Sequence, residues 1–275
     1  MPCPPGRRRT IRGSPAAPGI QQTMATYDSL APHYDAVTGD SAIEAAFIRS
    51  IIERRHGRAA TLLDVACGTG GITALLAGAY QVSGLDISAG MLAVARQKLP
   101  EGTPLYLADM TSFKLNASFD VIVCAYQGVN HLLSLSGWKR FFGCVYDHLN
   151  EGGVFVFDIA TVGYLARMAN IPKMVQQFAD NYVLIRVRTP NGAVFEWHLD
   201  VFELQPDGKY RLLAETVEMR SFPVDQIREA LHPKFIDIEA ADPDSDSADH
   251  DDRDRIWITC TKPRLPGPAA ARVGS

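Results

Sequence analysis

Segments with the hydrophobic spacing of a helix alternate with short apolar runs typical of buried strands along residues 41–159 of the chain. The first helical segment, residues 41–57, opens with Ser41 and Glu44 in the arrangement of a capping box. The next run, 61–66, is short and apolar and leads into glycines, which is typical of a strand buried on both faces. By the same criteria we expect strands at 80–85, 104–108, 119–125 and 154–159, and helices at 72–79, 88–99 and 138–149. Alternating units of this kind predict an α/β fold, a parallel sheet with helices on both faces.

A different period begins near Met174, where apolar and polar residues alternate one by one. Residues 195–201 follow this alternation, and the pairs Asn-Gly at 191–192 and Asp-Gly at 207–208 favour tight hairpin turns. We therefore expect three or four antiparallel strands, inserted over residues 171–222 as a lid or an oligomer contact. A helix at 223–231 and strands at 235–240 and 255–261 follow the insert.

Composition narrows the class of protein. Of the 275 residues, 47% are hydrophobic, yet no run approaches the roughly 18 apolar residues of a membrane span, so we expect no membrane contact. The five cysteines are scattered and odd in number, which argues against disulfides or a metal site and favours a cytoplasmic setting. A net charge of −4 makes nucleic acid an unlikely partner.

Both ends of the chain and one internal run differ from the folded part. Residues 1–25 are rich in proline and arginine and predict a disordered arm, and residues 263–275 predict a disordered tail. The folded domain would then comprise 26–170 and 223–262. The acidic run 242–254 lacks the glycine and the final glutamate of a calcium loop, so we expect a solvated loop there.

The candidate chemistry begins at the turn after the first strand. Gly68 and Gly70 allow the backbone to turn sharply and approach a ligand closely. A dinucleotide fingerprint needs a third glycine where this chain has Thr73, which disfavours a pyrophosphate. Asp64, just ahead of the turn, would repel a phosphate and suit a ligand with an ammonium group. S-adenosylmethionine (SAM) carries such an ammonium and no phosphate.

Two further carboxylates follow later strands. Asp86 ends the second strand, 18 residues beyond Gly68, where it can accept hydrogen bonds from both hydroxyls of a ribose. Asp109, after the third strand, could accept one from an adenine amino group. A nucleoside that is bound without phosphates is therefore the favoured ligand.

These motifs, in order and spacing, resemble those of class I SAM-dependent methyltransferases. The resemblance rests on residues 64–70 (Asp-Val-Ala-Cys-Gly-Thr-Gly), 84–88 (Gly-Leu-Asp-Ile-Ser), 108–110 (Ala-Asp-Met) and 119–124 (Phe-Asp-Val-Ile-Val-Cys). It implies a Rossmann-like, seven-stranded, mostly parallel sheet. The segment 27–35 and the loop 126–132 resemble those of small-molecule enzymes, including amino-sugar N-methyltransferases and glycine N-methyltransferase-like enzymes.

The resemblance also implies which positions border the cofactor. Gly68 and Gly70 would flank the methionine part, Asp86 would hold the ribose, and Asp109 with Met110 would border the adenine. The full set expected at the cofactor is Tyr34, Asp64, Ala66, Gly68, Gly70, Asp86, Ile87, Met91, Asp109, Met110 and Tyr126. Met91 is equally well explained by packing in its helix.

Methyl transfer needs alignment and the handling of one proton. His131, in the loop after the fourth strand, is the candidate base, because its ordinary pKa near 6.5 suits proton acceptance at neutral pH. Tyr27 could close over the site and donate hydrogen bonds, as could Tyr34, or both could simply pack. Asn130 could orient the acceptor or only close its loop.

The acceptor itself is less defined by the sequence. Gln127 stands where many relatives have aspartate, and Arg186 and Arg188 lie on one side of an inserted strand, where they could bind an anionic group. A solvated face or a subunit contact, such as that of a homodimer, explains the two arginines as well. We expect methyl transfer to an oxygen or nitrogen of a small polar metabolite. Other SAM chemistry such as cyclisation, a nicotinamide-dependent oxidoreductase and a non-catalytic cofactor-binding protein are the alternatives.

Overall fold

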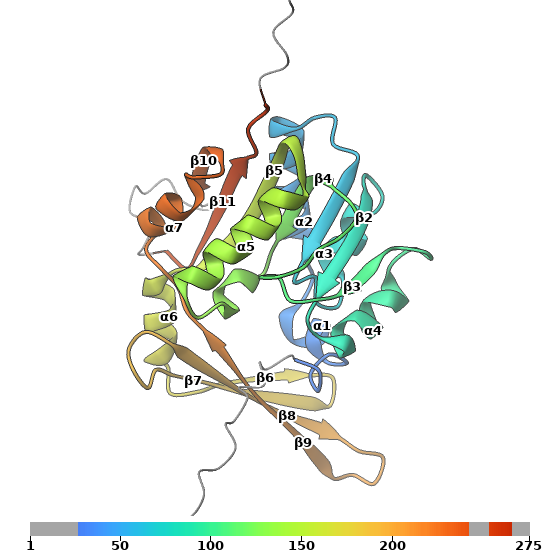
Figure 1. The fold of residues 1–275 in the computed structure, drawn as a ribbon. Coiled ribbons are helices and arrows are strands. Elements are labelled where there is room, and N and C mark those ends of the chain that lie inside the picture. Colours follow the sequence, from blue (N-terminus) through green and yellow to red (C-terminus); the bar gives the residue numbers. More distant parts are fainter. Residues whose placement is uncertain (1–26, 242–252, 266–275) are drawn as a thin grey trace, which may run out of the picture.

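The computed structural model describes residues 27–241 and 253–265. The expected arm at 1–25, most of the acidic run 242–254 and most of the tail lie outside these residues. Seven strands form one sheet in the order β10-β11-β5-β4-β1-β2-β3, mostly parallel, with β11 antiparallel to both of its neighbours. This is the predicted Rossmann-like architecture (Figure 1).

The strands of this sheet match the predicted order. They are β1 (Thr61–Val65), β2 (Gln81–Asp86), β3 (Leu105–Leu107), β4 (Phe119–Cys124), β5 (Leu149–Ala160), β10 (Ile236–Ala241) and β11 (Arg255–Thr261). Successive residues of the central strands point to opposite faces, and both faces are apolar. Leu62 and Leu63, for example, are both fully buried, on opposite sides of the sheet. The long buried runs therefore reflect burial on both faces.

Helices cover the two faces of the sheet. They are α1 (Tyr34–Thr38), α2 (Ala42–Arg55), α3 (Gly71–Leu76), α4 (Ala89–Lys98), η1 (Gly128–His131, a 3-10 turn), α5 (Leu135–His148), α6 (Val162–Ala169) and α7 (Val224–Leu231). Aromatic side chains of α5 pack with α7 on one face, and α2 with α3 packs on the other (Figure 1). Within residues 27–241 and 253–265, the helices are too short and too polar to cross a bilayer.

The insert forms a second, antiparallel sheet of four strands. They are β6 (Met174–Phe178), β7 (Asn181–Arg188), β8 (Phe195–Leu204) and β9 (Tyr210–Met219), paired in chain order. Gly192 and Gly208 have positive φ in the two expected hairpin turns. The second sheet lies across the carboxyl ends of the first sheet's central strands (Figure 1). It thereby faces the edge where a doubly wound fold binds its ligand.

Several local expectations were wrong. The Ser41 hydroxyl caps no backbone amide of α2, because it accepts a hydrogen bond from the Tyr126 hydroxyl at 3.0 Å, and Asp40 accepts from Ala42 N instead. Helix α5 starts at Leu135, three residues before the predicted start, since Ser134 caps it. Strand β5 starts five residues before the predicted 154, and neither α1 nor α6 was expected.

Candidate active site

A cavity of about 600 Å³ is lined by residues at the carboxyl ends of the parallel strands and by residues of β8 and β9 in the second sheet. Eleven of the predicted site residues line it: Tyr27, Tyr34, Ala66, Gly68, Asp86, Ile87, Met91, Asp109, Met110, Tyr126 and His131. They come from five separate segments of the chain, so the fold brings together residues as far apart as 27 and 131. The cavity lining comprises two halves. The cofactor half is formed at the ends of β1 and β2, and the second half is formed by His131 with Glu196, Thr216 and Glu218 of β8 and β9.

The glycine loop after β1 has the backbone its sequence predicts. Ala66, Gly68 and Gly70 all adopt positive φ, which gives the chain a tight turn into α3. A side chain at Gly70 would place its Cβ 3.1 Å from that of Ala95 in α4, so this glycine is needed for packing beneath the cavity. At Gly68 a Cβ would meet open space, so the backbone there is accessible to a ligand.

Asp86 links the glycine loop to the end of β2. Its carboxylate accepts hydrogen bonds from the backbone amides of Gly68 and Ser88, each at 2.8 Å. Burial raises the pKa of Asp86, and these amide bonds work against the rise. The Ile87 backbone amide also interacts with this carboxylate, and since a carboxylate can accept about four hydrogen bonds, about one acceptor position remains for a ligand in the cavity.

Asp64 and Gly70 lie near the cavity without lining it. The Asp64 carboxyl group is 2% exposed and accepts a hydrogen bond from the Thr73 hydroxyl at 2.5 Å. Burial raises the pKa of Asp64 to about 7. The carboxylate is thus costly to keep charged, and a cation placed nearby would lower that cost.

The segment 27–38 closes over the cofactor half of the cavity. Asp28 accepts hydrogen bonds from Ser88 Oγ and Gly90 N at the start of α4. Asp35 accepts one from Thr69 in the glycine loop and pairs with Lys98 of α4. The same segment is bound to the second sheet by His33, which contacts Glu203, and by Ser29, which donates to Glu215. The cover therefore contacts both sheets.

His131 points into the second half of the cavity with a defined tautomer. Its Nδ1 lies 3.1 Å from the Glu218 backbone oxygen, which can only accept, so Nδ1 carries the proton. Its Nε2 then has a free lone pair and accepts from the Tyr27 hydroxyl at 3.4 Å. Burial lowers the pKa of His131, so the imidazole is neutral at pH 7 and can take up a proton.

Four predicted substrate or catalytic residues lie outside the cavity lining. Asn130 is fully buried, where its side-chain amide bonds only backbone groups, those of Ala160 and Arg220, so it closes its loop. The Gln127 side chain donates to Asp158 at 3.3 Å. Arg186 pairs with Asp200 at 2.5 Å, and Arg188 is exposed.

The structure adds cavity residues that the sequence did not reveal as a group. They are Leu85, Ala108, Thr111, Ala125, Gly128, Leu132, Leu133, Ser134, Gly137, Arg140, Glu196, Thr216 and Glu218. Glu196 and Glu218 are directly opposed on β8 and β9. Glutamate at alternating positions of a strand is also the pattern of a solvated face, so no sequence signal separates these two from surface residues.

The fold is a doubly wound α/β sheet with a cavity at its strand ends, and comparisons with known proteins show which class of enzyme it resembles. Residues 62–153 match the family model described as a methyltransferase domain. A putative methyltransferase of Geobacillus sp. (strain WCH70) is 26% identical over 249 residues, which cover 86% of this chain and all of the relative.

A second relative and one solved structure are sugar methyltransferases by name. The dTDP-3-amino-3,6-dideoxy-alpha-D-glucopyranose N,N-dimethyltransferase of Streptomyces fradiae is 41% identical over 116 residues, 42% of this chain and 45% of the relative. The match thus spans about half of that enzyme. The solved sugar N-methyltransferase KedS8 from Streptoalloteichus sp. superposes with a TM-score of 0.74 at 24% identity, over 94% of this chain and all of that one. Residues 62–153 are thus similar to a methyltransferase domain, and the chain as a whole shares the fold of a solved sugar N-methyltransferase.

The raised pKa of Asp64 leads to a prediction about stability. Because the folded-state pKa of about 7 lies above the ordinary value of 3.8, proton uptake stabilises the folded protein at low pH, and that stabilisation is lost as the pH rises through 7. Asp64→Asn keeps the hydrogen-bond acceptor without the charge. We expect its unfolding temperature at pH 8 to exceed that of the wild type by at least about 2 °C, with a smaller difference at pH 5.

Thermal unfolding at pH 5, 6, 7 and 8 measures this difference. Asp225→Asn, a substitution at an exposed carboxylate on α7, is the control and should show no such trend. A difference for Asp64→Asn that is as large at pH 5 as at pH 8 would contradict the assignment of a buried, charged Asp64.

Proposed function

We propose that this protein transfers a methyl group from SAM to the nitrogen of an amine on a small polar acceptor. The observation that carries this proposal is the second half of the cavity, where His131 lies with Glu196 and Glu218. An amine is a cation in neutral water, so carboxylates attract it, and it must lose a proton before it can attack a methyl group. The amino-sugar enzyme named above supports a nitrogen acceptor.

The cofactor half of the cavity fits SAM. Asp86 offers its remaining acceptor position to a ribose hydroxyl, and the exposed backbone at Gly68 lets the methionine part approach closely. Met110 and Ile87 provide apolar contact for an adenine ring, with Asp109 beside them. When bound, SAM supplies an electrophilic methyl group on a sulfonium. The named methyltransferase relatives support methyl transfer over the cyclisation and oxidoreductase alternatives.

His131 removes the proton that an amine must lose. Its Nε2 lone pair faces the Tyr27 hydroxyl, which an acceptor amine would replace or contact. The Glu218 carbonyl keeps the other ring nitrogen protonated and so holds the ring in the accepting tautomer. Tyr27 itself stays protonated, because burial raises its pKa well above 10. It therefore orients groups by donating a hydrogen bond, and it does not act as a base.

Positioning supplies most of the remaining rate enhancement. In-line transfer needs the acceptor nitrogen held against the methyl group in a site without bulk water. The cover formed by residues 27–38 provides that enclosure, since it contacts α4, the glycine loop and the second sheet. Arg140 also lines the cavity and can contact an anionic part of the acceptor.

A variant of His131 tests the assignment of the base. His131→Gln should lower kcat by roughly a hundredfold or more, with SAM affinity unchanged. In the wild type, kcat should fall as the pH drops through the pKa of His131, which burial places below 6.5, because only the neutral ring accepts a proton. Rates of S-adenosylhomocysteine release with dTDP-3-amino-3,6-dideoxyglucose as the probe acceptor measure both effects. Wild-type turnover in His131→Gln would remove it from the reaction.

A second variant tests the recognition of an amine. Glu218→Gln removes one carboxylate and should raise KM for the amino-sugar probe by about tenfold, the effect of one charged hydrogen bond. The KM for SAM should stay within about twofold. Glu229→Gln, an equal loss of charge at an exposed position on α7, is the control. Equal KM values in both variants would show that the carboxylate does not bind the acceptor.

We further propose a homodimer formed through exposed apolar residues of the second sheet near the turn at 205–209, on the same face as Glu196 and Glu218. Apolar side chains gather there on paired positions of neighbouring strands, including Tyr182 opposite Phe202, and Phe202 opposite Leu212. The exposed apolar residues of this sheet are Val175, Tyr182, Phe202, Leu204, Tyr210 and Leu212. Patches of this kind usually mark interfaces. Light scattering should give a mass of about 60 kDa, twice that of the 30.1 kDa chain. Phe202→Glu should reduce the measured mass towards that of one chain. A monomeric wild type would contradict the proposed dimer.

A cytoplasmic location is also part of the proposal. The cysteines within the described ranges are free thiols, and Cys67, Cys124 and Cys260 are buried. Free thiols persist in a reducing compartment. Cell fractionation tests this location.

A further inference from the structure

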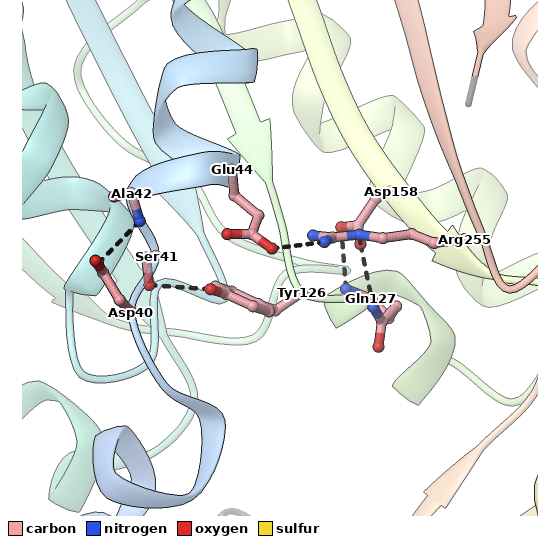
Figure 2. A network of polar contacts seen from close by, with 8 residues as sticks. All are labelled: Asp40, Ser41, Ala42, Glu44, Tyr126, Gln127, Asp158 and Arg255. Atoms are coloured by element: carbon pink, nitrogen blue, oxygen red, sulfur yellow. Dashed lines mark hydrogen bonds and ion pairs between the residues drawn. The ribbon is translucent and has the colours of Figure 1, made fainter. Parts of the chain in front are cut away.

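A partly buried ionic network of Glu44, Asp158 and Arg255 lies beside Tyr126 and Gln127 of the loop that follows β4 (Figure 2). Arg255, the first residue of β11, donates from Nε to Asp158 at 2.6 Å and from Nη1 to Glu44 of α2 at 2.9 Å. Asp158, in β5, is fully buried. Three elements distant in sequence therefore meet at one guanidinium group, next to the loop that follows β4.

Asp158 connects this network to the loop. It accepts a hydrogen bond from the Gln127 backbone amide at 3.0 Å and another from the Gln127 side chain (Figure 2). Tyr126 on the same loop lines the cavity, and its hydroxyl donates to Ser41 at 3.0 Å. The Arg255 guanidinium lies 5.4 Å from the centre of the Tyr126 ring. The loop is thus held from its backbone and from its aromatic side chain.

The loop needs this support because its backbone is strained. Tyr126 and Gln127 are consecutive non-glycine residues with φ of 56° and 58°. Such conformations cost on the order of 1–3 kcal/mol each and persist only where surrounding contacts hold them. The next residue, Gly128, packs so closely that an added Cβ would lie 2.9 Å from the Cβ of Ala66 in the glycine loop. The loop therefore has no room to move towards the glycine loop.

Arg255 is what allows Asp158 to hold the loop as a carboxylate. Burial raises the pKa of Asp158, and the charge of Arg255 works against that rise. Without the guanidinium, a fully buried carboxylate would be left uncompensated, which is strongly unfavourable. It would then take up a proton or draw in water, and either change weakens its hydrogen bonds to Gln127.

We propose that Arg255 is a positioning residue for methyl transfer: through Asp158 it fixes the strained turn at Tyr126 and Gln127, and with it the placement of His131 against the cofactor. It does not line the cavity, so it acts through other residues. The consequence for the rate rests on the function proposed above. The consequence for the loop does not.

The experiment therefore has an arm that needs no turnover. Hydrogen exchange over residues 125–132 is compared in the wild type, Arg255→Lys and Arg255→Met. Lysine keeps the charge but cannot reach Asp158 and Glu44 together with a planar group. We expect exchange in this segment to accelerate by at least about tenfold in both variants, because the loss of one hydrogen bond to a charged group has an effect of that size.

The matched control is Arg55→Lys. Like Arg255, Arg55 links α2 to a strand of the first sheet. It ends α2, donates a hydrogen bond to the Asp237 carbonyl and pairs with Glu239 of β10, away from the loop at 125–132. Its variant should leave exchange at 125–132 unchanged. Equal acceleration in Arg55→Lys would mean a general loosening of the fold and would overturn the proposal, as would wild-type exchange in both Arg255 variants. If Arg255→Met does not fold, Arg255→Lys decides.

The second arm measures turnover with the amino-sugar probe. In Arg255→Lys we expect kcat to fall by about tenfold, while the Kd for SAM and the unfolding temperature stay close to those of Arg55→Lys. Unchanged kcat in folded Arg255→Lys would overturn the positioning role. If the wild type itself methylates no amine probe, the proposed function fails, and the exchange arm still decides whether Arg255 holds the loop.

Discussion

The whole site depends on one constraint, the burial of the central strands on both faces. Strands β1, β4 and β5 are packed between apolar layers, so polar side chains can occur only near the ends of the strands. Three carboxylates occupy such positions: Asp64 in β1, Asp86 at the end of β2 and Asp158 near the end of β5. Each is nearly or fully buried, and each needs partners to offset the cost of burial.

The partners of these carboxylates determine the shape of the cavity. Asp86 is stabilised by the amides of Gly68 and Ser88, which fixes the glycine loop relative to α4. Asp158 is stabilised by Arg255 and by the amide of Gln127, which fixes the loop after β4. Asp64 accepts a hydrogen bond from the Thr73 hydroxyl, and burial raises its pKa to about 7.

The sequence predicts those parts of the site that depend on local backbone geometry. The glycines at 68 and 70, the carboxylate at 86 and the loop carrying His131 follow from strand ends and spacing, and the cavity contains all but Gly70. Where the prediction was wrong, a distant residue competes for a local partner. Ser41 and Glu44 have the pattern of a capping box, yet Tyr126 and Arg255 engage them instead. Pairings across 85 and 211 residues leave no periodic signal in one sequence, and neither does the approach of Glu218 to His131.

The two halves of the cavity consequently carry different kinds of information. The stretch that matches the methyltransferase model ends at residue 153, before the second sheet begins. Glu196, Thr216 and Glu218 all belong to that second sheet, as does the carbonyl that sets the tautomer of His131. The cofactor half is built from backbone turns that tolerate few substitutions, whereas strand positions facing a cavity can change without altering the register. Acceptor choice can therefore differ between proteins that share the cofactor half. For this chain, the negative charge on β8 and β9 supports the proposed amine acceptor independently of the likeness to the amino-sugar enzyme.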